Sequence, residues 1–584
     1  MVPEETDVGP GGTGVAAVPD WGTIPRMLRD QAARHPETTV IVDGEVRLTL
    51  AELRARATMV AKGLMALGVE RGDRVAIWGL NDVHWAVGAY GIWDAGAVIV
   101  PLSSRYKGIE AAEVLGKTGA TVLIMGDNLD GAPPFAEVLA AAAGAPTTTP
   151  VPAGDPGPTP RPARSPGATE PGVERPFAGL PELRHAIVPE GLRHPGTLQP
   201  SRVLAAGDLI ADEDAEARAL SVRPDDLCEI MSTSGTTGTP KGVMLDHGQV
   251  VRGYWDWAEI VTLGEGDRYP VIAPFAHGFG LNAGLVAGVM RRATLMPVKV
   301  FTPGGLRDLV LEGRITILAG APTLFHRLLD EVDITGHSVR VAICGAAAVP
   351  AELIHRLLRE AGLQRVINAY GLMEGTVVSM TRAGDPVEVI ASSTGRPVPG
   401  IDVKIVDDDG KEVPTAERGE ILQRGYGVMR GYWGEPDKTA EVIRDGWLHT
   451  GDIGTLDARG NLAVVDRKKE LFIVNGFNVS PAEVESLLLH RPDLAQAAVV
   501  GVPDGRSGEA GRAYVVPRPG AAPDPAEIIN WARGNMSNYK VPRQVIVVDA
   551  LPLNANGKID KRLLRARAAE EAPPGDRPAE TGRG

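Results

Sequence analysis

The chain has 584 residues, of which 43% are hydrophobic and 23% are charged. These proportions are close to the averages for soluble globular proteins and exclude a wholly disordered chain, and the length allows several domains. Sixty Lys and Arg against 74 Asp and Glu give a net charge of −14, which repels polyanions and disfavours nucleic acid as a partner.

Cysteine usage and the start of the chain both bear on the compartment. The two cysteines, Cys228 and Cys344, show no CxxC spacing, so we expect a reducing compartment and no disulfide framework. The first residues, MVPEETDVGPGG, lack the basic and apolar blocks of a signal peptide. The apolar window from Val83 to Leu102 is interrupted by His84 and Asp94, which favours core helix and strand over a membrane span. The sequence therefore predicts a cytoplasmic protein.

In chain order, residues 1–20 are expected to form a flexible arm, followed by alternating helical and strand patterns. The stretch AELRARATMVAKGLMALG has helical spacing, and DRVAIWGL predicts a short buried strand. Such alternation is typical of mainly parallel sheets covered by helices. Ten prolines lie between Pro146 and Pro176, and we expect a Pro-rich inserted loop over about 131–205.

The pattern changes twice in the second half. Ile401, Val403 and Ile405 alternate with polar residues, which predicts a smaller β-rich section. After Lys469, the stretches LFIV, PAEVESLLLH, AQAAVVGV, GRAYVVP, DPAEIINWARG and RQVIVV predict a compact α+β unit. The predicted fold class is α/β: a large N-terminal domain (21–466) of helix-covered, mainly parallel sheets plus a small β-rich section, a small α+β C-terminal domain (467–567) and a flexible tail (568–584).

Serine, threonine and glycine are concentrated in MSTSGTTGTPKG, residues 231–242. Apolar stretches flank this run, which favours a pre-shaped loop over a solvated linker. Glycines let the backbone approach an anion, hydroxyls and amides donate to phosphate oxygens, and Lys241 supplies positive charge. It is not the Walker pattern GxxxxGK(S/T), because Gly242 follows the lysine, and a P-loop GTPase or ATPase is disfavoured. From composition alone, a phosphate site and a plain loop both remain open.

The string STSGTTGTPKG closely resembles the signature of the adenylate-forming (ANL) superfamily, which contains acyl-CoA synthetases, adenylation domains and luciferases. Six further blocks follow in the family's order, and the resemblance runs from about residue 20 to 565. The blocks are APFAHGFG (273–280), NAYGLMEGT (368–376), GEILQRGYGVMRGYW (419–433), WLHTGDIG (447–454), DRKKELFIVNGFNVSPAEVE (466–485) and NANGKIDK (554–561).

The resemblance implies an ATP site built from these blocks. Tyr370 would stack on adenine, and Asp452 and Arg467 would contact the ribose hydroxyls. Without the resemblance, Tyr370 could be a buried aromatic, Asp452 a turn cap and Arg467 a solvated charge. The implied nucleotide- and cofactor-binding residues are Ser232, Thr233, Ser234, Gly235, Thr236, Thr237, Gly238, Lys241, Gly345, Ala346, Ala347, Asn368, Ala369, Tyr370, Gly371, Met373, Asp452, Arg467, Lys469, Gly476, Phe477 and Lys558.

The resemblance also implies three catalytic residues, Lys558, Glu374 and Lys241. Glu374 would hold magnesium, which prefers carboxylate and phosphate oxygens. Lys558 would bond the substrate carboxylate and the α-phosphate oxygens, because a cation lowers the repulsion between these two anions as charge redistributes. Without the resemblance, Lys558 would be an ordinary exposed turn lysine.

The acid and CoA sites are implied in the same way. The substrate-binding residues would be His277, Gly278, Phe279, Asn282 and Gly371, with further pocket walls from residues 254–257, 345–347 and 371–373. The resemblance makes the C-terminal domain mobile about a hinge at Lys469. It also makes residues 475–478, including Gly476 and Phe477, a lining of the pantetheine path.

One departure from the family pattern and several missing motifs narrow the range of functions that the sequence predicts. The family usually has Thr before the acidic residue, where this chain has Met373, and a thioether donates no hydrogen bond to phosphate. The loss of about 1 kcal/mol predicts slower adenylation. A GxGxxA match over residues 278–283 lacks the acidic residue expected about 20 positions later, where Lys299 stands, so a dinucleotide site is disfavoured. There is no HExxH, GxSxG or paired-cysteine pattern.

The predicted function is an ATP-dependent carboxylic acid:CoA ligase that forms an acyl-adenylate and then a thioester, using ATP, magnesium and coenzyme A. The phrases GFNVSPAEVE and AYGLMEG resemble actinobacterial acyl-CoA ligases for medium-chain or steroid-derived acids. Two alternatives stay open: loading of a separate carrier protein, and nucleotide binding with weak or no turnover because of Met373. The absence of an insertion between Gly460 and Pro481 favours CoA over a carrier. A homodimer is also allowed.

Overall fold

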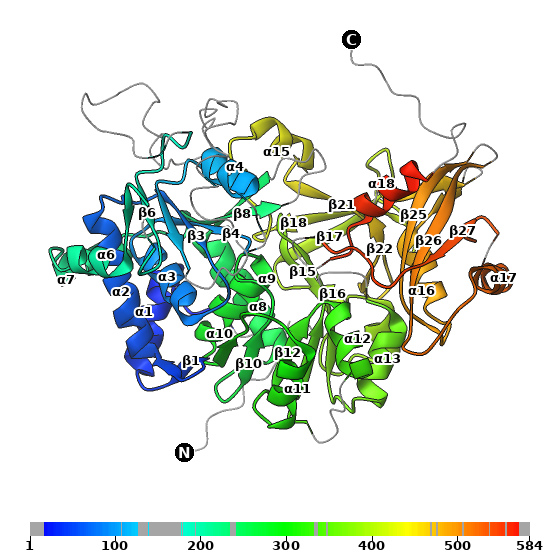
Figure 1. Ribbon diagram of the computed structural model, residues 1–584, viewed down its shortest axis with the longest axis horizontal. Coiled ribbons are helices and arrows are strands. Elements are labelled where there is room, and N and C mark those ends of the chain that lie inside the picture. Colours follow the sequence, from blue (N-terminus) through cyan, green and yellow to red (C-terminus); the bar gives the residue numbers. More distant parts are fainter. Residues whose placement is uncertain are drawn as a thin grey trace, which may run out of the picture.

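The structure is a computed structural model that describes residues 17–104, 106, 108–126, 138, 177, 179–192, 194–233, 241–331, 337–345, 349–467, 470–474, 477–504, 507–536, 538–554 and 558–571. Figure 1 shows a large N-terminal part and, at its right-hand side, a smaller α+β unit formed by the end of the chain. Most of the expected arm, the proline-rich stretch and most of the tail lie outside the described residues.

An eight-stranded sheet lies in the N-terminal part, in the strand order β19-β9-β8-β4-β3-β5-β6-β7. Neighbours from β8 to β7 are parallel, whereas β9 and β19 are each antiparallel to their neighbours. The strands are β3 (Arg74–Trp78), β4 (Val98–Leu102), β5 (Val122–Met125), β6 (His185–Ile187), β7 (Thr197–Leu198), β8 (Leu227–Thr233), β9 (Lys241–Asp246) and β19 (Gly431–Tyr432).

Helices cover both faces of this sheet. Along β3, Val75 and Ile77 belong to the core that contains α1 to α3, while Ala76 and Trp78 belong to the core that contains α4. Parallel strands buried on both faces are near-continuous apolar runs, which explains the stretch RVAIW. The helices are α1 (Ile24–Arg34), α2 (Leu50–Ala66), α3 (Val83–Asp94), α4 (Gly108–Thr118), α6 (Pro200–Gly207) and α7 (Asp212–Leu220).

The expected inserted loop, about 131–205, ends earlier than predicted. The strand β6 pairs in parallel with β5, and its Ala186 and Ile187 are buried. Pro200 does not interrupt regular structure, because it occupies the first position of α6, where no intrahelical amide donor is needed. Helices α6 and α2 approach so closely that a Cβ on Gly207 would lie 2.8 Å from the Gly63 nitrogen. Residues 185–192 and 194–207 therefore belong to the folded N-terminal part.

Two further sheets and their helices complete the α/β portion. One has the order β10-β11-β1-β2 and the other β12-β13-β14-β15-β16. Their strands are β1 (Thr39–Asp43), β2 (Val46–Thr49), β10 (Arg268–Val271), β11 (Thr294–Pro297), β12 (Ile317–Gly320), β13 (Val341–Cys344), β14 (Val366–Leu372), β15 (Thr376–Met380) and β16 (Arg396–Pro397). The helices are α8 (His247–Val261), α9 (Gly278–Gly280), the π-helix η1 (Leu281–Val286), α10 (Ala287–Met290), α11 (Pro303–Leu311), α12 (Pro322–Glu331), α13 (Ala351–Arg359) and α14 (Val387–Ser392).

An antiparallel section follows, as the alternating sequence predicts. Its strands pair as β17-β18-β21-β20, and β22 pairs with β21. The elements are β17 (Ile401–Val406), β18 (Gly419–Gly425), α15 (Pro436–Val442), β20 (Ile443–Arg444), β21 (Trp447–Leu456) and β22 (Leu462–Arg467).

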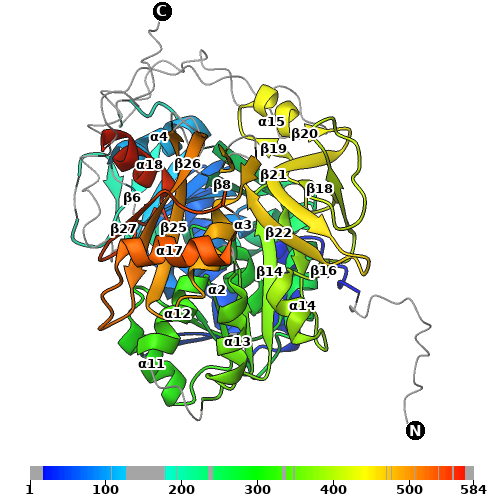
Figure 2. The same ribbon diagram turned by 90° about the vertical axis from the view of Figure 1, so that its right-hand side faces the viewer.

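The C-terminal unit is a five-stranded sheet with helices on both faces (Figure 2). Helices α16 and α17 share one apolar cluster with the sheet, and α18 belongs to another. The expected tail begins later than residue 568, because Ala568 is buried within α18. The elements are β23 (Phe472–Val474), β24 (Phe477–Val479), α16 (Pro481–Leu488), β25 (Leu494–Asp504), β26 (Gly508–Pro517), α17 (Pro525–Asn535), β27 (Gln544–Val547) and α18 (Lys561–Glu570).

The predicted fold class is confirmed: helix-covered, mainly parallel sheets, a β-rich section and a small C-terminal α+β unit. The apolar window from Val83 to Leu102 forms α3 and β4 in the core. In the part of the chain that the structure describes, no helix combines the length and the apolar character needed to cross a bilayer.

Candidate active site

The signature loop connects two antiparallel strands of the eight-stranded sheet. Thr233 at the end of β8 pairs with Lys241 at the start of β9, and Ser232 pairs with Gly242. The two strands of the hairpin pack closely, since a Cβ on Gly242 would lie 2.7 Å from a methyl carbon of Ile230. The loop tip itself, residues 234–240, lies outside the described residues.

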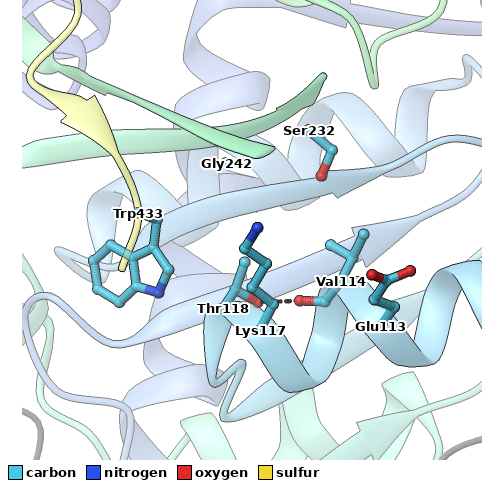
Figure 3. A pocket seen from close by; sticks show the side chains of 7 residues that line it. All are labelled: Glu113, Val114, Lys117, Thr118, Ser232, Gly242 and Trp433. Atoms are coloured by element: carbon cyan, nitrogen blue, oxygen red, sulfur yellow. Dashed lines mark hydrogen bonds between the residues drawn. The ribbon is translucent and has the colours of Figure 1, made fainter. Parts of the chain in front are cut away.

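A small cavity of about 10 Å³ lies beside the base of this hairpin (Figure 3). A cavity of this size has room for about one water molecule. Within it the Thr118 hydroxyl donates to the Val114 carbonyl over 2.7 Å, a bond within α4. The cavity is therefore a packing gap under the hairpin and not a substrate site. Its lining residues are Glu113, Val114, Lys117, Thr118, Ser232, Gly242 and Trp433.

Tyr432 connects two of the predicted catalytic residues. Its hydroxyl donates to Glu374 Oε1 over 3.0 Å, and the ammonium of Lys241 lies 4.4 Å from the centre of its ring. Burial, and then the Glu374 carboxylate, raise the pKa of Tyr432, so the phenol stays a hydrogen-bond donor at neutral pH. Lys241 and Glu374 thus face a common tyrosine, although they are 133 positions apart in the sequence.

The predicted adenosine contacts also come together. The Tyr370 hydroxyl on β14 donates to Asp452 Oδ2 on β21 over 2.5 Å. Asp452 is the cross-strand partner of Arg467, the last residue of β22. Only the backbone of Arg467 is described. An aromatic ring and a buried carboxylate therefore lie together at one place, with an arginine backbone directly opposite the carboxylate.

Two residues of the predicted nucleotide site, Asn368 and Gly345, have structural contacts within the N-terminal part. The Asn368 side chain is buried and donates through Nδ2 to the carbonyls of Ile390 and Ser393 at 3.1 and 2.9 Å. Its amide donors are thus used to hold α14, which differs from the nucleotide contact predicted for it. Gly345 is required by packing, since a Cβ there would lie 2.7 Å from the Ala369 carbonyl oxygen.

Met373 packs against the predicted substrate segment. A Cβ built on Gly278 would lie 3.1 Å from the Met373 sulfur, so the two residues are in close contact. Gly371 is likewise constrained, because a Cβ there would lie 2.5 Å from the Thr376 carbonyl oxygen. Thr376 itself has φ +56°, a left-handed conformation that β-branched residues rarely adopt. The turn that follows Glu374 is therefore strained.

The substrate segment 277–282 is held by Asn81, which follows β3. Asn81 Nδ2 donates to the carbonyls of Val271 and Ala273, at 3.0 and 2.9 Å. Its Oδ1 accepts from the Phe275 amide at 2.7 Å. The side chain is buried, so these bonds fix the chain two residues before His277.

His277 caps the short helix α9. Its Nδ1 accepts from the Phe279 amide at 3.2 Å. Burial, and then the positive charge of Lys558, lower the pKa of His277 to about 4. The imidazole is therefore neutral at pH 7 and carries its proton on Nε2, which remains a donor.

Lys558 is the second cause of the lowered pKa of His277. This lysine belongs to the C-terminal unit, in a turn where Asn554 Oδ1 accepts from the Lys558 amide at 3.1 Å and the Asn554 amide donates to the Lys558 carbonyl at 2.7 Å. Its charge acts on His277 of the N-terminal part. A lysine of the C-terminal unit thus contributes to the electrostatic environment of His277 in the N-terminal part.

Asn282 is placed differently from the prediction. It lies fully buried in η1 and donates to Glu229 Oε1 over 2.9 Å. Burial raises the pKa of Glu229 to about 7, and Glu229 Oε2 has no hydrogen-bond partner. Asn282 therefore supports the π-helix from behind, through a second buried polar side chain, and has no exposed atom for a substrate.

Nine of the predicted site residues lie outside the part of the chain that the structure describes. The positions outside the described residues are Ser234, Gly235, Thr236, Thr237, Gly238, Ala346, Ala347, Lys469 and Gly476. Of Arg467 and Phe477 only the backbone is described. The described neighbour of the expected hinge is Glu470, which binds Lys561 Nζ over 3.1 Å.

Sequence reasoning missed Tyr432, Glu229 and Asn81. Tyr432 stands inside the quoted block GEILQRGYGVMRGYW, so its position was visible but its contacts were not. Glu229 carried a signal, because a charged residue inside the apolar stretch LCEIM is unusual for a buried strand. Asn81 carried none beyond its place after a predicted strand.

Magnesium is the metal that these residues fit. Glu374 offers carboxylate oxygens, the ligand type that magnesium prefers. In the described ranges no three His, Cys, Asp or Glu side chains form a ligand group. A magnesium ion at Glu374 would therefore take most of its ligands from phosphate and water, as it does in nucleotide sites.

A cation-bearing hairpin, an aromatic residue beside a buried carboxylate, and a lysine on a separate unit are the features expected of a nucleotide-dependent acid-activating enzyme. Comparison with protein families agrees: residues 28–433 match the AMP-binding enzyme family and residues 483–558 match the AMP-binding enzyme C-terminal domain. The chain belongs to the AMP-binding enzyme family.

Curated relatives extend over almost the whole chain. It is 39% identical over 549 residues to the 3-(7a-methyl-1,5-dioxo-octahydro-1H-inden-4-yl)propanoyl:CoA ligase of Rhodococcus jostii, covering 93% of this chain and 98% of that protein. It is 35% identical over 547 residues to a feruloyl-CoA synthase of Amycolatopsis, covering 92% and 97%. The chain is an AMP-forming acid–thiol ligase of the acyl-CoA synthetase type, with ATP, magnesium and CoA as its cofactors and co-substrates.

Solved structures give the same fold. The ATP-bound RpMatB-BxBclM chimera B3 is 27% identical with a TM-score of 0.78, covering 94% of this chain and 99% of that one. The anthranilate CoA ligase AuaEII in complex with anthranoyl-AMP is 25% identical with a TM-score of 0.78, covering 94% and 98%.

The buried Glu229 makes a testable contribution to pH-dependent stability. Its folded pKa of about 7 lies above the unfolded value of 4.5, so its contribution is fully present below pH 4.5 and is lost as pH rises through 7. We expect Glu229→Gln to remove this loss, which amounts to at most about 3 kcal/mol. Thermal unfolding of both proteins between pH 5 and 8 measures it. Parallel melting curves over that range would contradict the assignment.

Proposed function

We propose that Lys558 and Lys241 flank the reacting anions while a carboxylic acid attacks the α-phosphate of ATP, and that CoA then takes the acyl group. The observation that carries the proposal is the contact of Tyr432 with both Lys241 and Glu374, because it places the predicted phosphate-binding and magnesium-binding residues at one site. In the first half-reaction the acid forms an acyl-adenylate and pyrophosphate leaves. In the second, the CoA thiol attacks the acyl carbonyl and AMP leaves.

Each described side chain has a physical task in the first half-reaction. Tyr370 and Asp452 bind adenosine, the ring by stacking and the carboxylate by accepting from ribose hydroxyls. Lys241 and the hairpin amides bind the phosphates. When bound at Glu374, magnesium supplies positive charge that neutralises the phosphate oxygens.

The acid carboxylate would lie between His277 and Lys558. Because His277 is neutral, its Nε2 proton can donate to a carboxylate oxygen without adding charge. Lys558 then supplies the cation that offsets repulsion between the carboxylate and the α-phosphate. Met373 adds no hydroxyl donor, so we expect slower adenylation than a threonine would give.

In the second half-reaction Lys558 must leave the position that the thiol enters. We propose that the C-terminal domain turns about Lys469 between the two steps. We assign this domain to residues 467–567 and expect residues 475–478 to line the pantetheine path.

For the acid, we propose a medium-chain or steroid-derived carboxylic acid. Support comes from the 39% identity to the indenyl-propanoyl:CoA ligase of Rhodococcus jostii and the 31% identity to a medium-chain acyl-CoA ligase of Mus musculus. Pyrophosphate release across a panel of fused-ring propanoic, medium-chain and aromatic acids tests the assignment. Preference for aromatic acids, the class acted on by the feruloyl-CoA synthase relative, would contradict it.

The proposal also covers the acyl acceptor, the cellular compartment and the oligomeric state. Supplying purified acyl-adenylate with either free CoA or a phosphopantetheinylated carrier protein shows which of the two is the acyl acceptor.

Both cysteines are buried and unpaired, which supports a reducing compartment such as the cytoplasm. A homodimer would appear as twice the 61.5 kDa mass in solution.

Replacing Lys558 separates the two half-reactions. We expect Lys558→Ala to lower pyrophosphate release with ATP and acid by about 100-fold or more, because it removes a cation aimed at the transition state. The same variant should still convert supplied acyl-adenylate to thioester. Lys411→Ala, which removes an exposed lysine in the β-rich section, is the matched control. Pyrophosphate release at the wild-type rate in Lys558→Ala would contradict the role.

Lys561 is expected to position the turn that carries Lys558. Its ammonium binds Glu470 Oε2 at 3.1 Å and Glu485 Oε1 at 2.9 Å, so it joins that turn to the expected hinge and to α16. We expect Lys561→Met to lower the turnover of adenylation about tenfold with little change in the KM for ATP, and to destabilise the unit by about 2 kcal/mol.

Arg562→Met is the control for this change, because Arg562 pairs locally with Asp560 at 3.1 Å. Initial-rate kinetics and thermal unfolding distinguish the two variants. Equal effects of both substitutions on adenylation turnover would remove the special role of Lys561.

A further inference from the structure

Tyr432 is in direct contact with two charged residues that the proposed mechanism needs. Its hydroxyl donates to Glu374 Oε1 at 3.0 Å, and its ring faces the Lys241 ammonium at 4.4 Å. Among the described residues, which include both Lys241 and Glu374, no ion pair within 4.0 Å joins these two. The two opposite charges therefore share a neutral partner and do not neutralise each other.

The backbone holds Tyr432 firmly in this place. The strand β19 pairs with β9, with Tyr432 opposite Val243, two residues after Lys241. The Tyr432 amide donates to Thr439 Oγ1 at 2.9 Å, and the next residue, Trp433, donates its amide to the Gly242 carbonyl at 2.7 Å. Tyr432 is 6% exposed, so its ring has little freedom to move away.

Glu374 is also fixed relative to this segment through its backbone. Its carbonyl accepts from the Met429 amide at 2.8 Å. The turn after it is anchored as Gln423 Nε2 donates to the Gly375 carbonyl at 2.7 Å. One segment, residues 423–433, therefore contacts both the hairpin that carries Lys241 and the turn that carries Glu374.

We propose that Tyr432 is a positioning residue that keeps Lys241 and Glu374 apart and oriented, so that the first stays available to phosphate and the second to magnesium. This inference rests on the proposed function. A lysine and a glutamate without such a spacer attract each other, and a direct pair would have to break before either could bind the nucleotide. The aromatic face stabilises the ammonium without cancelling its charge, and the hydroxyl orients the carboxylate in the same way.

The two contacts can be removed one at a time. Tyr432→Phe keeps the ring beneath Lys241 and removes the bond to Glu374, while Tyr432→Leu removes both. The measurement is calorimetric binding of ATP and of AMP, each with and without magnesium, together with the magnesium dependence of pyrophosphate–ATP exchange. AMP lacks the β- and γ-phosphates, so it reports on the adenosine site alone.

For Tyr432→Phe we expect the affinity for magnesium–ATP to fall about tenfold, the size of losing one hydrogen bond to a charged group. The magnesium concentration for half-maximal exchange should rise by a similar factor, while AMP binding stays within about twofold of the wild type. For Tyr432→Leu we expect a further fall of about threefold in ATP affinity without magnesium, because the ammonium loses its aromatic partner.

Tyr426→Phe is the matched control. Tyr426 lies in the same segment, donates its hydroxyl to Asp256 Oδ2 at 2.9 Å and has the Arg252 guanidinium 5.5 Å from its ring, so the chemical change is the same. We expect this variant to bind magnesium–ATP as the wild type does. Thermal unfolding of all three variants shows whether they remain folded.

Three results would overturn the inference: equal weakening of AMP and magnesium–ATP in Tyr432→Phe, no weakening of either, or the same weakening of magnesium–ATP in Tyr426→Phe. Failure of the proposed function is distinguishable. It would appear as absence of exchange in the wild-type protein with every acid, whereas the contrast between ATP and AMP binding needs no turnover.

Discussion

Repulsion between a carboxylate and a triphosphate is the constraint that this site must overcome. Two like unit charges 4 Å apart repel by about 1 kcal/mol in water and about 4 kcal/mol at an effective dielectric constant of 20, so closing the site makes the problem harder. The chain supplies cations from separate elements, Lys241 on a hairpin of the large sheet and Lys558 on a turn of the C-terminal unit. A cation on a separate unit has a further consequence in the proposed mechanism, because a movement of that unit would withdraw it before the thiol approaches.

Lys241, Glu374 and Asp452 share a second property: each of them contacts a neutral tyrosine. Lys241 faces the Tyr432 ring, Glu374 accepts from the Tyr432 hydroxyl and Asp452 accepts from the Tyr370 hydroxyl. Elsewhere the chain pairs charge with charge, as Arg29 does with Asp94 at 2.9 Å in the core. A neutral partner orients a charged group and leaves its charge available, whereas a counter-ion must first be displaced. Tyrosine suits this task because it offers a ring face to a cation and a hydroxyl to an anion.

Much of this arrangement was predictable where the information is local. The stretch RVAIW predicts a strand buried on both faces, and the signature string predicts a turn between two apolar strands. The end of the inserted loop was misplaced because β6 has three residues, too few for a periodic pattern. The block that contains Asn368 resembles a nucleotide-binding motif and therefore predicts a nucleotide contact for it. In the structure its side-chain amide holds α14, through carbonyls that lie 22 and 25 positions away in the sequence.

The contacts of Tyr432 could not be predicted from the residues around it. They form only because the two-residue strand β19 pairs with β9, nearly 190 positions earlier in the chain. Neither composition nor spacing within the block 419–433 indicates that its tyrosine at 432 faces a lysine and a glutamate, while its tyrosine at 426 faces an aspartate and an arginine. Long-range pairing of short strands therefore decides which of two similar side chains enters the site.

The stability of the C-terminal unit bears on whether Lys558 can be withdrawn intact. The unit has its own apolar clusters on both faces of its sheet, and Lys561 bridges Glu470 and Glu485 within it. Its contacts with the N-terminal part include an ion pair between Arg518 and Asp330 at 3.6 Å, with 33% and 22% of the side chains exposed. Ion pairs of this exposure contribute about 0–1 kcal/mol. The proposed rotation of the unit would break such contacts far more easily than it would disrupt the clusters. The turn that carries Lys558 would then move as part of a rigid body and keep the geometry that Lys561 gives it.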